Sequence, residues 1–167
     1  MSAEELRAKI REVPDFPKPG ILFYDITTLL KDAPAYKEAI DLMLAPYKDE
    51  RIDIVVGMES RGFIFSSPMA YLLDAGLVPV RKLGKLPAET ITVEYALEYG
   101  SNTLEIHRDA IQPEQKVLIV DDLLATGGTV HGTLVAPSPQ LRLSWPVCVD
   151  ADAAGTKTAR APLARTH

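Results

Sequence analysis

Apolar residues recur along the first part of the chain either at helical spacing or in short runs. Helical spacing predicts helices over residues 3–13, 34–47 and 61–75. Short apolar runs predict strands over residues 21–24, 52–57, 78–81, 90–95, 103–107 and 117–120. Strands that alternate with helices indicate an α/β fold with a right-handed, mainly parallel sheet.

The last of these runs leads into the most informative motif, V-L-I-V-D-D-L-L-A-T-G-G-T-V at residues 117–130. Its first four residues are typical of a strand buried on both faces of a parallel sheet. Asp121 and Asp122 then stand at the carboxyl end of that strand, where open α/β sheets bind ligands. Two acids there are suited to vicinal hydroxyls or to a metal-bound substrate.

The turn that follows has the composition of a phosphate cradle. Gly permits close approach of backbone N–H groups at a helix N-terminus, and the two Thr hydroxyls add donors. The predicted cradle is Ala125, Thr126, Gly127, Gly128 and Thr129. Neither the Walker pattern nor the dinucleotide fingerprint occurs, which argues against nucleoside triphosphates and NAD.

This motif resembles the 5-phosphoribosyl-1-pyrophosphate (PRPP) motif of the type I phosphoribosyltransferases. The resemblance implies an α/β fold with a central, mostly parallel sheet flanked by helices, a small N-terminal hood and a flexible lid hairpin. It also implies that Asp121 and Asp122 contact the ribose hydroxyls in catalysis and that residues 125–129 bind the 5-phosphate. The similarity covers residues 1 to about 132.

Two further segments resemble the adenine-specific members of that family. In residues 16–30, F-P-K-P-G-I-L-F-Y-D-I-T-T-L-L, prolines and a glycine fix an irregular backbone before a short strand. By resemblance this is the hood, in which the backbone of Leu22 meets the edge of the base and Asp25 lies near the site.

The second segment, V-V-G-M-E-S-R-G-F, is a strand end and a turn that presents Arg61 to an anion or a planar ring. By resemblance, Glu59 and Ser60 belong to the pyrophosphate site, often with a cis peptide bond between them, and Arg61 helps to hold adenine. The family usually has Gly where this chain has Ser66, a change expected to affect local packing without abolishing folding.

Three cations, Arg81, Lys82 and Lys85, follow a predicted strand within five residues. Such a cluster in an otherwise acidic chain is suited to gripping a diphosphate, and a solvated basic loop is the alternative. The resemblance suggests a clamp shared across a dimer.

Residues 87–102 form a predicted hairpin whose Glu98 and Tyr99 match the E-Y-G at the tip of the family's lid. Closure of a lid would exclude water from an oxocarbenium-like transition state. Glu98 is then expected to act in catalysis on the proton of the attacking base, and Tyr99 to belong to the lid.

Composition narrows the class of protein further. A chain of 167 residues with 47% hydrophobic content is expected to form a single domain, comprising residues 1–167. The net charge of -5 argues against a general nucleic-acid binder. No apolar stretch approaches a membrane span or a signal peptide, so a cytoplasmic protein without membrane partners is expected.

The histidines do not predict a zinc site, because His107, His131 and His167 have neither an i, i+4 partner nor a cysteine companion. Mg²⁺ is the expected cofactor, since it binds through few carboxylates together with substrate phosphates. No direct protein ligand set is expected for this ion, which PRPP would carry.

The chain departs from the family pattern in its last segment, residues 133–167. Pro137 and Pro139 would end any helix within about two turns. Alternating apolar residues over 141–149 predict a strand that Pro146 confines to an edge. Natural divergence and a shifted reading frame are both compatible with this tail.

The chain is therefore expected to have a helix and hood (1–30), a core with the lid (31–132) and a divergent tail. The resemblance implies transfer of the phosphoribosyl group from PRPP to adenine, which yields AMP and pyrophosphate in purine salvage, by a homodimer. The alternatives are an enzyme for xanthine, hypoxanthine or orotate, and a PRPP-binding regulatory or inactive module.

Overall fold

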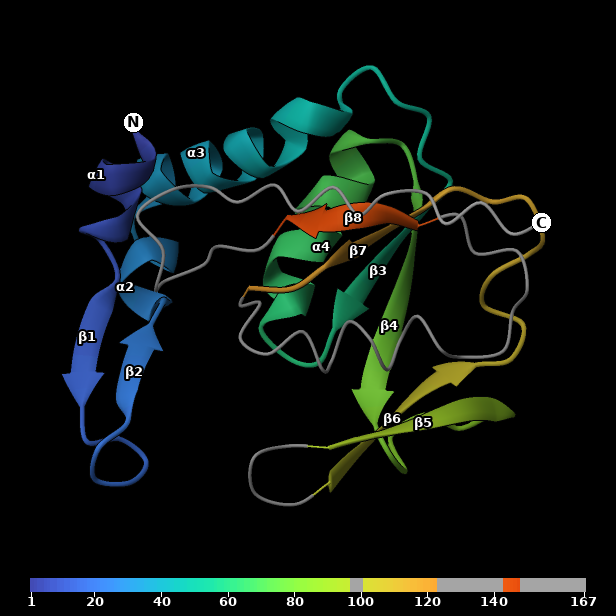
Figure 1. Cartoon of the computed structure of the whole chain (residues 1–167). Coiled ribbons are helices and arrows are strands. Elements are labelled where there is room, and N and C mark those ends of the chain that lie inside the picture. Colours follow the sequence, from blue (N-terminus) through green and yellow to red (C-terminus); the bar gives the residue numbers. More distant parts are fainter. Residues whose placement is uncertain (97–100, 123–142, 148–167) are drawn as a thin grey trace, which may run out of the picture. The chain divides into compact units, whose positions relative to one another are not determined.

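The computed structural model describes residues 1–96, 101–122 and 143–147 (Figure 1). These residues divide into two compact units, one made of residues 1–48 and the other of the described residues from 49 onward. The predicted hood lies within the first unit. The organisation of the whole chain as a single domain stays a prediction.

The first unit contains helices and a two-stranded sheet. Its elements are α1 (Ala3–Arg7), β1 (Arg11–Pro14), β2 (Leu22–Asp25), α2 (Thr27–Leu30), α3 (Ala33–Leu44) and the 3-10 helix η1 (Ala45–Tyr47). A capping box formed by Ser2 and Glu5 starts α1, and the Asp32 side chain caps α3. Leu6, Leu29 and Ala35 are among the residues of its apolar core.

The predicted helix over residues 3–13 is wrong in its second half. Helix α1 ends at Arg7, and Arg11–Pro14 form β1, which pairs antiparallel with β2. In this register Val13 lies opposite Phe23. Apolar spacing alone did not reveal this, because cross-strand pairing decides the conformation of a segment that ends in β-branched Val and Pro.

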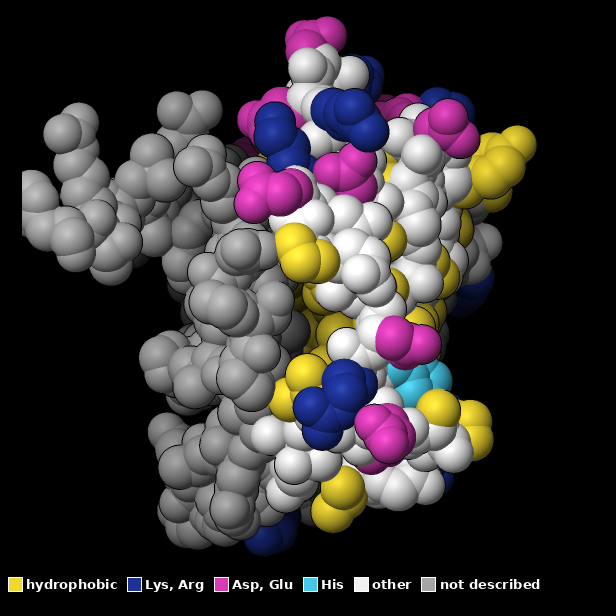
Figure 2. Space-filling model, turned by 90° about the vertical axis from the view of Figure 1, so that its right-hand side faces the viewer, with side chains coloured by type: hydrophobic (Ala, Val, Ile, Leu, Met, Phe, Trp, Pro, Cys, Tyr) yellow, Lys and Arg dark blue, Asp and Glu magenta, His cyan; other side chains and the backbone are white. Residues whose placement is uncertain are grey.

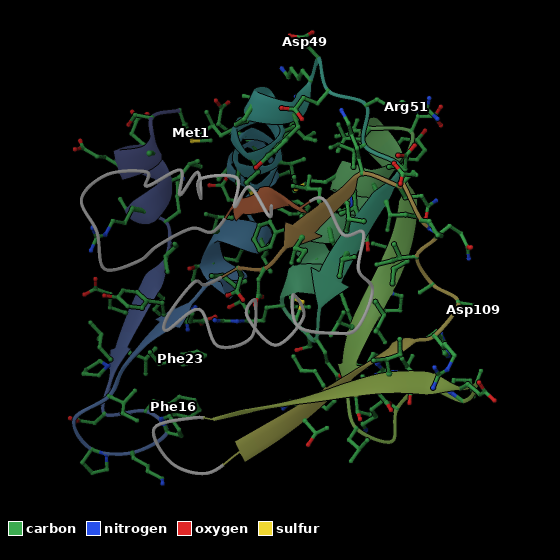
Figure 3. The ribbon with its side chains drawn as sticks, turned by 45° about the vertical axis from the view of Figure 1, so that its right-hand side comes forward. Met1, Phe16, Phe23, Asp49, Arg51 and Asp109 are labelled. Carbon is green, nitrogen blue, oxygen red and sulfur yellow. The ribbon has the colours of Figure 1, made fainter. Side chains whose placement is uncertain are left out.

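The turn between β1 and β2 brings two aromatic rings together. Phe16 and Phe23 lie side by side in Figure 3, with ring centroids 5.1 Å apart in an edge-to-face arrangement. Asp15 Oδ1 accepts a hydrogen bond from Gly20 N–H at 2.7 Å across the turn, and Gly20 has a φ of 86° that suits glycine. The proline-rich hood segment is thus an ordered turn.

The second unit is built on a six-stranded sheet in the order β5-β6-β4-β3-β7-β8. Its elements are β3 (Ile54–Met58), α4 (Gly62–Leu72), β4 (Gly76–Lys82), β5 (Thr90–Ala96), β6 (Ser101–His107), β7 (Val117–Val120) and β8 (Leu143–Val147). Strand β3 is parallel to β4 and β7, and β8 is parallel to β7. The β5–β6 hairpin joins β4 in antiparallel fashion.

These assignments confirm the predicted mostly parallel α/β sheet. The strand bounds differ from the predicted ones by at most two residues, while α4 ends three residues before the predicted position of 75. Asp74, with a φ of 52°, lies in the turn that follows α4. The predicted edge strand in the tail is also confirmed, since β8 is the outermost strand next to β7.

The core of this unit surrounds the parallel strands. Residues on one face of the sheet, including Val56, Met58 and Ile119, form an apolar cluster. Helix α4 packs against β3, β4 and β7 on the other face (Figure 1). All four residues of β7 are buried, as its continuous apolar run predicted.

Gly57 and Ser66 lie at the contact between β3 and α4. Ser66 is fully buried, and a Cβ atom added at Gly57 would collide with Ser66 Oγ. Among the described residues the Ser66 hydroxyl has no hydrogen-bond partner. The serine that replaces the family's usual glycine is therefore accommodated, at the cost of a buried polar group.

The surface is of mixed charge. Figure 2 shows acidic and basic side chains next to one another, with apolar side chains between them, on the face that it presents. Within the described residues no helix is long and apolar enough to cross a membrane.

Candidate active site

The predicted site residues of the second unit gather at one edge of its sheet. Because β3 lies between β4 and β7 and is parallel to both, the carboxyl ends of all three strands meet there. The turn of residues 59–61 follows β3, the acid pair follows β7, and Arg81 and Lys82 end β4. This is the edge at which open α/β sheets bind ligands.

The acid pair is joined to the turn by an ion pair. Arg61 Nη2 lies 2.6 Å from Asp122 Oδ2, and the Asp122 side chain is only 8% exposed. The backbone N–H of Asp122 donates to Asp121 Oδ1 at 2.9 Å. A cation predicted to address a base and an acid predicted to address a ribose are therefore in direct contact.

Asp121 is poised to change its charge near neutral pH. Burial raises its pKa to about 7; the Asp122 N–H opposes this increase, while the negative charge of Asp122 adds to it. Below that pH the Asp121 carboxyl carries a proton and is a hydrogen-bond donor. Above it, Asp121 is an anion suited to accept hydrogen bonds from hydroxyl groups.

Gly62 allows the start of α4 to approach the end of β7 closely. A Cβ atom at this position would lie 2.8 Å from the carbonyl oxygen of Val120 and 3.1 Å from Asp121 Oδ1. Any side chain would push the turn away from the acid pair. The E-S-R-G-F motif thus needs glycine at this position because there is no room for a side chain.

The peptide bond between Glu59 and Ser60 is cis, which confirms what the resemblance implied. The Glu59 carboxylate turns toward the end of β4. Its Oε2 accepts hydrogen bonds from Lys82 N–H at 2.8 Å and from Arg81 Nε at 3.3 Å. Burial alone would raise the pKa of Glu59, but these bonds and the cations outweigh burial and lower it.

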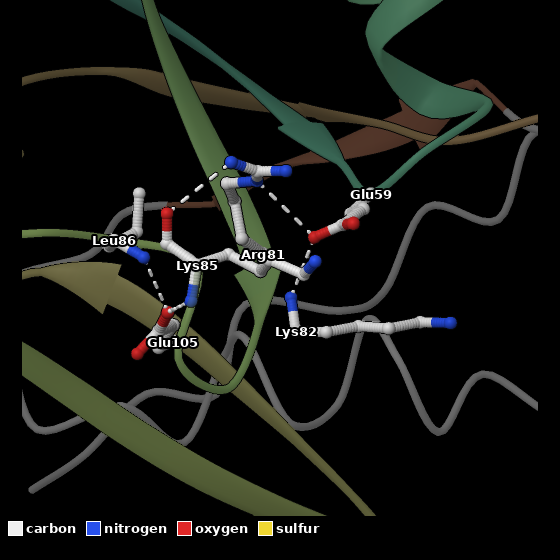
Figure 4. Close-up of polar contacts among 6 residues, drawn as sticks. All are labelled: Glu59, Arg81, Lys82, Lys85, Leu86 and Glu105. Carbon is white, nitrogen blue, oxygen red and sulfur yellow. Dashed lines mark hydrogen bonds and ion pairs between the residues drawn. The ribbon is translucent and has the colours of Figure 1, made fainter.

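We call residues 81–86 the cationic segment. Arg81 Nη1 donates to the Lys85 carbonyl at 3.3 Å, which folds the segment back on itself (Figure 4). Lys82 and Lys85 are exposed, and the Arg81 side chain is 33% exposed. The predicted cluster of three cations is therefore one ordered turn beside Glu59.

Sequence reasoning missed Glu105, a buried residue of β6. Its Oε1 accepts hydrogen bonds from the backbone N–H groups of Lys85 at 2.7 Å and Leu86 at 2.8 Å (Figure 4). The available signal was a charged residue between the apolar Leu104 and Ile106 of a predicted strand. An acid at such a position is normally expected to face solvent.

The remaining predicted site residues lie either in the first unit or outside the described residues. Leu22 belongs to the first unit, where it is 44% exposed and opposite Pro14 in the β1–β2 pairing. Glu98, Tyr99 and the predicted phosphate cradle, residues 125–129, lie outside the described residues. Their predicted roles stay predictions.

Comparison with known proteins identifies the family. The family model for the phosphoribosyl transferase domain matches residues 26–136, so the chain belongs to the phosphoribosyltransferase family. Among its relatives is the adenine phosphoribosyltransferase of Acidobacterium capsulatum, which is 59% identical over 80% of this chain and 74% of its own length.

Solved structures give the same result. The chain is similar to adenine phosphoribosyltransferase from Rhodothermus marinus, with a TM-score of 0.79 and 48% identity over 87% of this chain and 82% of that one. The enzyme from Saccharomyces cerevisiae, solved with an imino-altritol bisphosphate and adenine, gives a TM-score of 0.78 and 37% identity, with 87% of both chains covered. These neighbours confirm the type I phosphoribosyltransferase fold.

Proposed function

We propose that this chain is an adenine phosphoribosyltransferase that makes AMP and pyrophosphate from adenine and PRPP in purine salvage. Relatives that are 59% and 60% identical to it carry that name. The observation that carries the proposal is the Arg61–Asp122 ion pair at 2.6 Å. It joins the turn expected to hold the base to the acid pair expected to hold the ribose, as a reaction between base and ribose requires.

In the proposed reaction a ring nitrogen of adenine attacks the anomeric carbon of PRPP. A carbon–nitrogen bond forms, the bond to the pyrophosphate oxygen breaks, and the nitrogen gives up its proton. Asp121 and Asp122 would orient the ribose hydroxyls, while residues 125–129 would bind the 5-phosphate. Glu98 would interact with the departing proton, and Tyr99 would belong to the lid that excludes water.

The leaving pyrophosphate and the attacking base would be bound by different groups. Arg81, Lys82 and Lys85 would stabilise the charge of the leaving pyrophosphate. Glu59 and Ser60 would support them, because the Glu59 carboxylate already holds the Arg81 guanidinium and the Lys82 backbone. Arg61 and the backbone of Leu22 would address adenine.

Mg²⁺ is proposed as the cofactor. The described residues contain no cluster of three or more side chains suited to hold a metal ion. Asp121 and Asp122 would add only oxygen donors near a Mg²⁺ ion held mainly through the phosphates of PRPP, which fits the preference of this ion for oxygen. When bound, the ion would neutralise charge on the pyrophosphate. Cytoplasmic residence and a homodimer are proposed from the sequence and the family resemblance.

The test is AMP formation from PRPP, Mg²⁺ and adenine, run beside hypoxanthine, guanine, xanthine and orotate. Turnover with adenine alone is expected, and the double variant Asp121→Asn, Asp122→Asn should lose roughly a thousandfold in rate. Turnover only with another base would contradict the adenine assignment. Tight PRPP binding by calorimetry without product would instead identify a binding module.

A further inference from the structure

Glu105 is a buried acid for which the proposed reaction has no direct use. The residue is 4% exposed, and Ser66 and Asp122 are also buried polar residues. Burying a carboxylate costs free energy unless hydrogen bonds replace its water. The position of Glu105 therefore requires a compensating set of donors.

The backbone donors come from the cationic segment, and the Thr90 side chain adds a donor from β5, which pairs with β6. Glu105 Oε1 is 2.7 Å from Lys85 N and 2.8 Å from Leu86 N. Burial by itself raises the pKa of Glu105, but hydrogen bonds from the backbone of Leu86, Lys85 and Gly84 and from the Thr90 side chain outweigh it and lower the pKa. The acid is thus an anion whose charge is satisfied by amide dipoles.

Sheet register explains why Glu105 reaches this turn. Glu105 lies directly opposite Arg81 in the antiparallel pairing of β4 with β6. The chain leaves β4 after Lys82 and bends at Gly84, which has a φ of 82°. The segment then passes over the carboxylate with its amide groups directed toward Glu105 (Figure 4).

The cationic segment is therefore tied down by two acids. Glu59 holds its first part through Arg81 Nε and Lys82 N, and Glu105 holds its second part through backbone amides alone. Because Glu105 bonds the backbone, the Lys85 ammonium group remains available at the surface. The segment has a fixed backbone that still presents its cationic side chains.

We propose that Glu105 is a positioning residue for the pyrophosphate end of the substrate. By fixing the backbone of residues 84–86 it sets the direction of the Lys85 side chain and of the carbonyl that holds Arg81. This inference rests on the proposed function, in which these cations bind pyrophosphate. What matters is the reach of the Glu105 oxygen to two N–H groups, since a negative charge alone would repel the ligand.

The test uses two variants of the full chain to separate the effect of the length of the Glu105 side chain from the effect of its charge. Glu105→Gln keeps an acceptor oxygen at the same distance, whereas Glu105→Asp keeps the charge but shortens the side chain by one methylene. Calorimetric titration with inorganic pyrophosphate and Mg²⁺ should give a Kd raised roughly tenfold for Glu105→Asp. The Kd of Glu105→Gln should stay within about threefold of the wild-type value.

Kinetics add a readout that general destabilisation does not move. For Glu105→Asp the KM for PRPP should rise with the pyrophosphate Kd, while the KM for adenine stays unchanged. Ile106→Val, on the same strand and in the apolar core, is the control for lost stability. Glu50→Gln, at an exposed position, is the control for lost charge. Both controls should keep the wild-type pyrophosphate Kd.

A folded Glu105→Asp variant with wild-type pyrophosphate affinity would overturn the inference. A Gln variant that binds as weakly as the Asp variant would also overturn it, because the reach of an acceptor oxygen would then not be sufficient to position the segment. Failure of the proposed function would look different. In that case the wild-type protein itself would bind no pyrophosphate and form no AMP.

Discussion

Two strands flank β3, and each carries charged side chains at its carboxyl end. Beyond β7 the acids Asp121 and Asp122 lie next to one another, close to the cation Arg61. At the end of β4 the cations are grouped and the acids are their partners, because the cationic segment is held by the separate acids Glu59 and Glu105. The same edge of the sheet thus contains an acid site with a basic partner and a basic site with acidic partners.

The two sites differ in how their acids are satisfied. Glu59 and Glu105 accept hydrogen bonds from backbone amides, and the pKa of each is lowered despite the opposing effect of burial. Asp121 is dominated by burial and has a neighbouring acid, so its pKa is raised to about 7. Amide donors stabilise a permanent charge, whereas burial of a carboxyl group, with a second acid beside it, produces a charge that depends on pH.

The largest difference should appear when each arginine is removed. Arg61→Met leaves Asp122 buried without its close cation, and we expect the free energy of unfolding to fall by about 3 kcal/mol. Arg81→Met should cost only about 1 kcal/mol, because Glu59 keeps the Lys82 amide and is more exposed. Urea denaturation at pH 8 measures both. Equal losses would contradict the contrast between the two sites.

Replacement of a glycine by alanine should give the next largest difference in stability between the two sites. Gly62→Ala places a methyl group 2.8 Å from the Val120 carbonyl, so we expect a loss of about 2 kcal/mol and a displaced acid pair. Gly84→Ala meets no atom within 4 Å and suffers only from its positive φ, at about 1 kcal/mol. Denaturation together with the KM for PRPP distinguishes the two. A Gly62→Ala protein as stable as wild type would refute the close approach.

The pH dependence of stability should come from the acid site. The folded protein holds the Asp121 proton up to about pH 7, while the ordinary pKa of an aspartic acid is 3.8. The contribution of Asp121 to the free energy of unfolding therefore falls as the pH rises between these values. Asp121→Asn should remove this slope and exceed the wild-type stability at pH 8 by roughly 1 to 2 kcal/mol. Urea denaturation of both proteins between pH 4 and pH 8, a range set by about these two pKa values, checks the slope.

The amide-bonded acids should show the opposite dependence. Because the pKa values of Glu59 and Glu105 are lowered, their contribution to stability is present above the pKa of an unfolded glutamate and is lost as the pH falls below it. Urea denaturation of Glu105→Gln and wild type at about pH 3, 5 and 8 checks the sign. A Gln variant whose deficit grows toward low pH would contradict it.

The smallest effect concerns the packing that supports both sites. Ser66→Ala removes a buried hydroxyl without a partner among the described residues, and we expect a gain of about 1 kcal/mol. Ser66→Gly also removes the hydroxyl, but the lower helix propensity of glycine should cancel most of that gain. Thermal unfolding gives the order, and neither change should alter the pyrophosphate Kd. A loss on Ser66→Ala would indicate that the hydroxyl is satisfied.

Strands with a continuous apolar pattern could be predicted from the sequence, as could the residues that follow them. The run ending at Val120 is a strand, and Asp121 and Asp122 stand at its end as expected. The segment around Val13 could not be predicted, because its conformation depends on pairing with a separate strand, β2. Local spacing carries no information about such a partner.

Contacts between segments that are distant in the sequence could not be predicted either. The Arg61–Asp122 ion pair requires β3 and β7 to be neighbours, although β4, β5 and β6 lie between them in the sequence. Glu105 reaches Lys85 because β6 pairs with β4 at one particular register. Strand order and register follow from the packing of the whole sheet, so the motifs predicted Arg61, Asp122 and Lys85 as site residues but neither Glu105 nor these contacts.

The position of β8 has a consequence for how molecules of this protein meet one another. Without this strand, β7 would end the sheet as four apolar residues with open backbone groups, which is a template for a strand from another molecule. Pro146 has no N–H to offer a further strand, and the pairing of β8 with β7 shifts register beside it. A strand from the segment whose sequence departs furthest from the family thus covers the edge of β7, which is expected to disfavour edge-to-edge pairing between molecules.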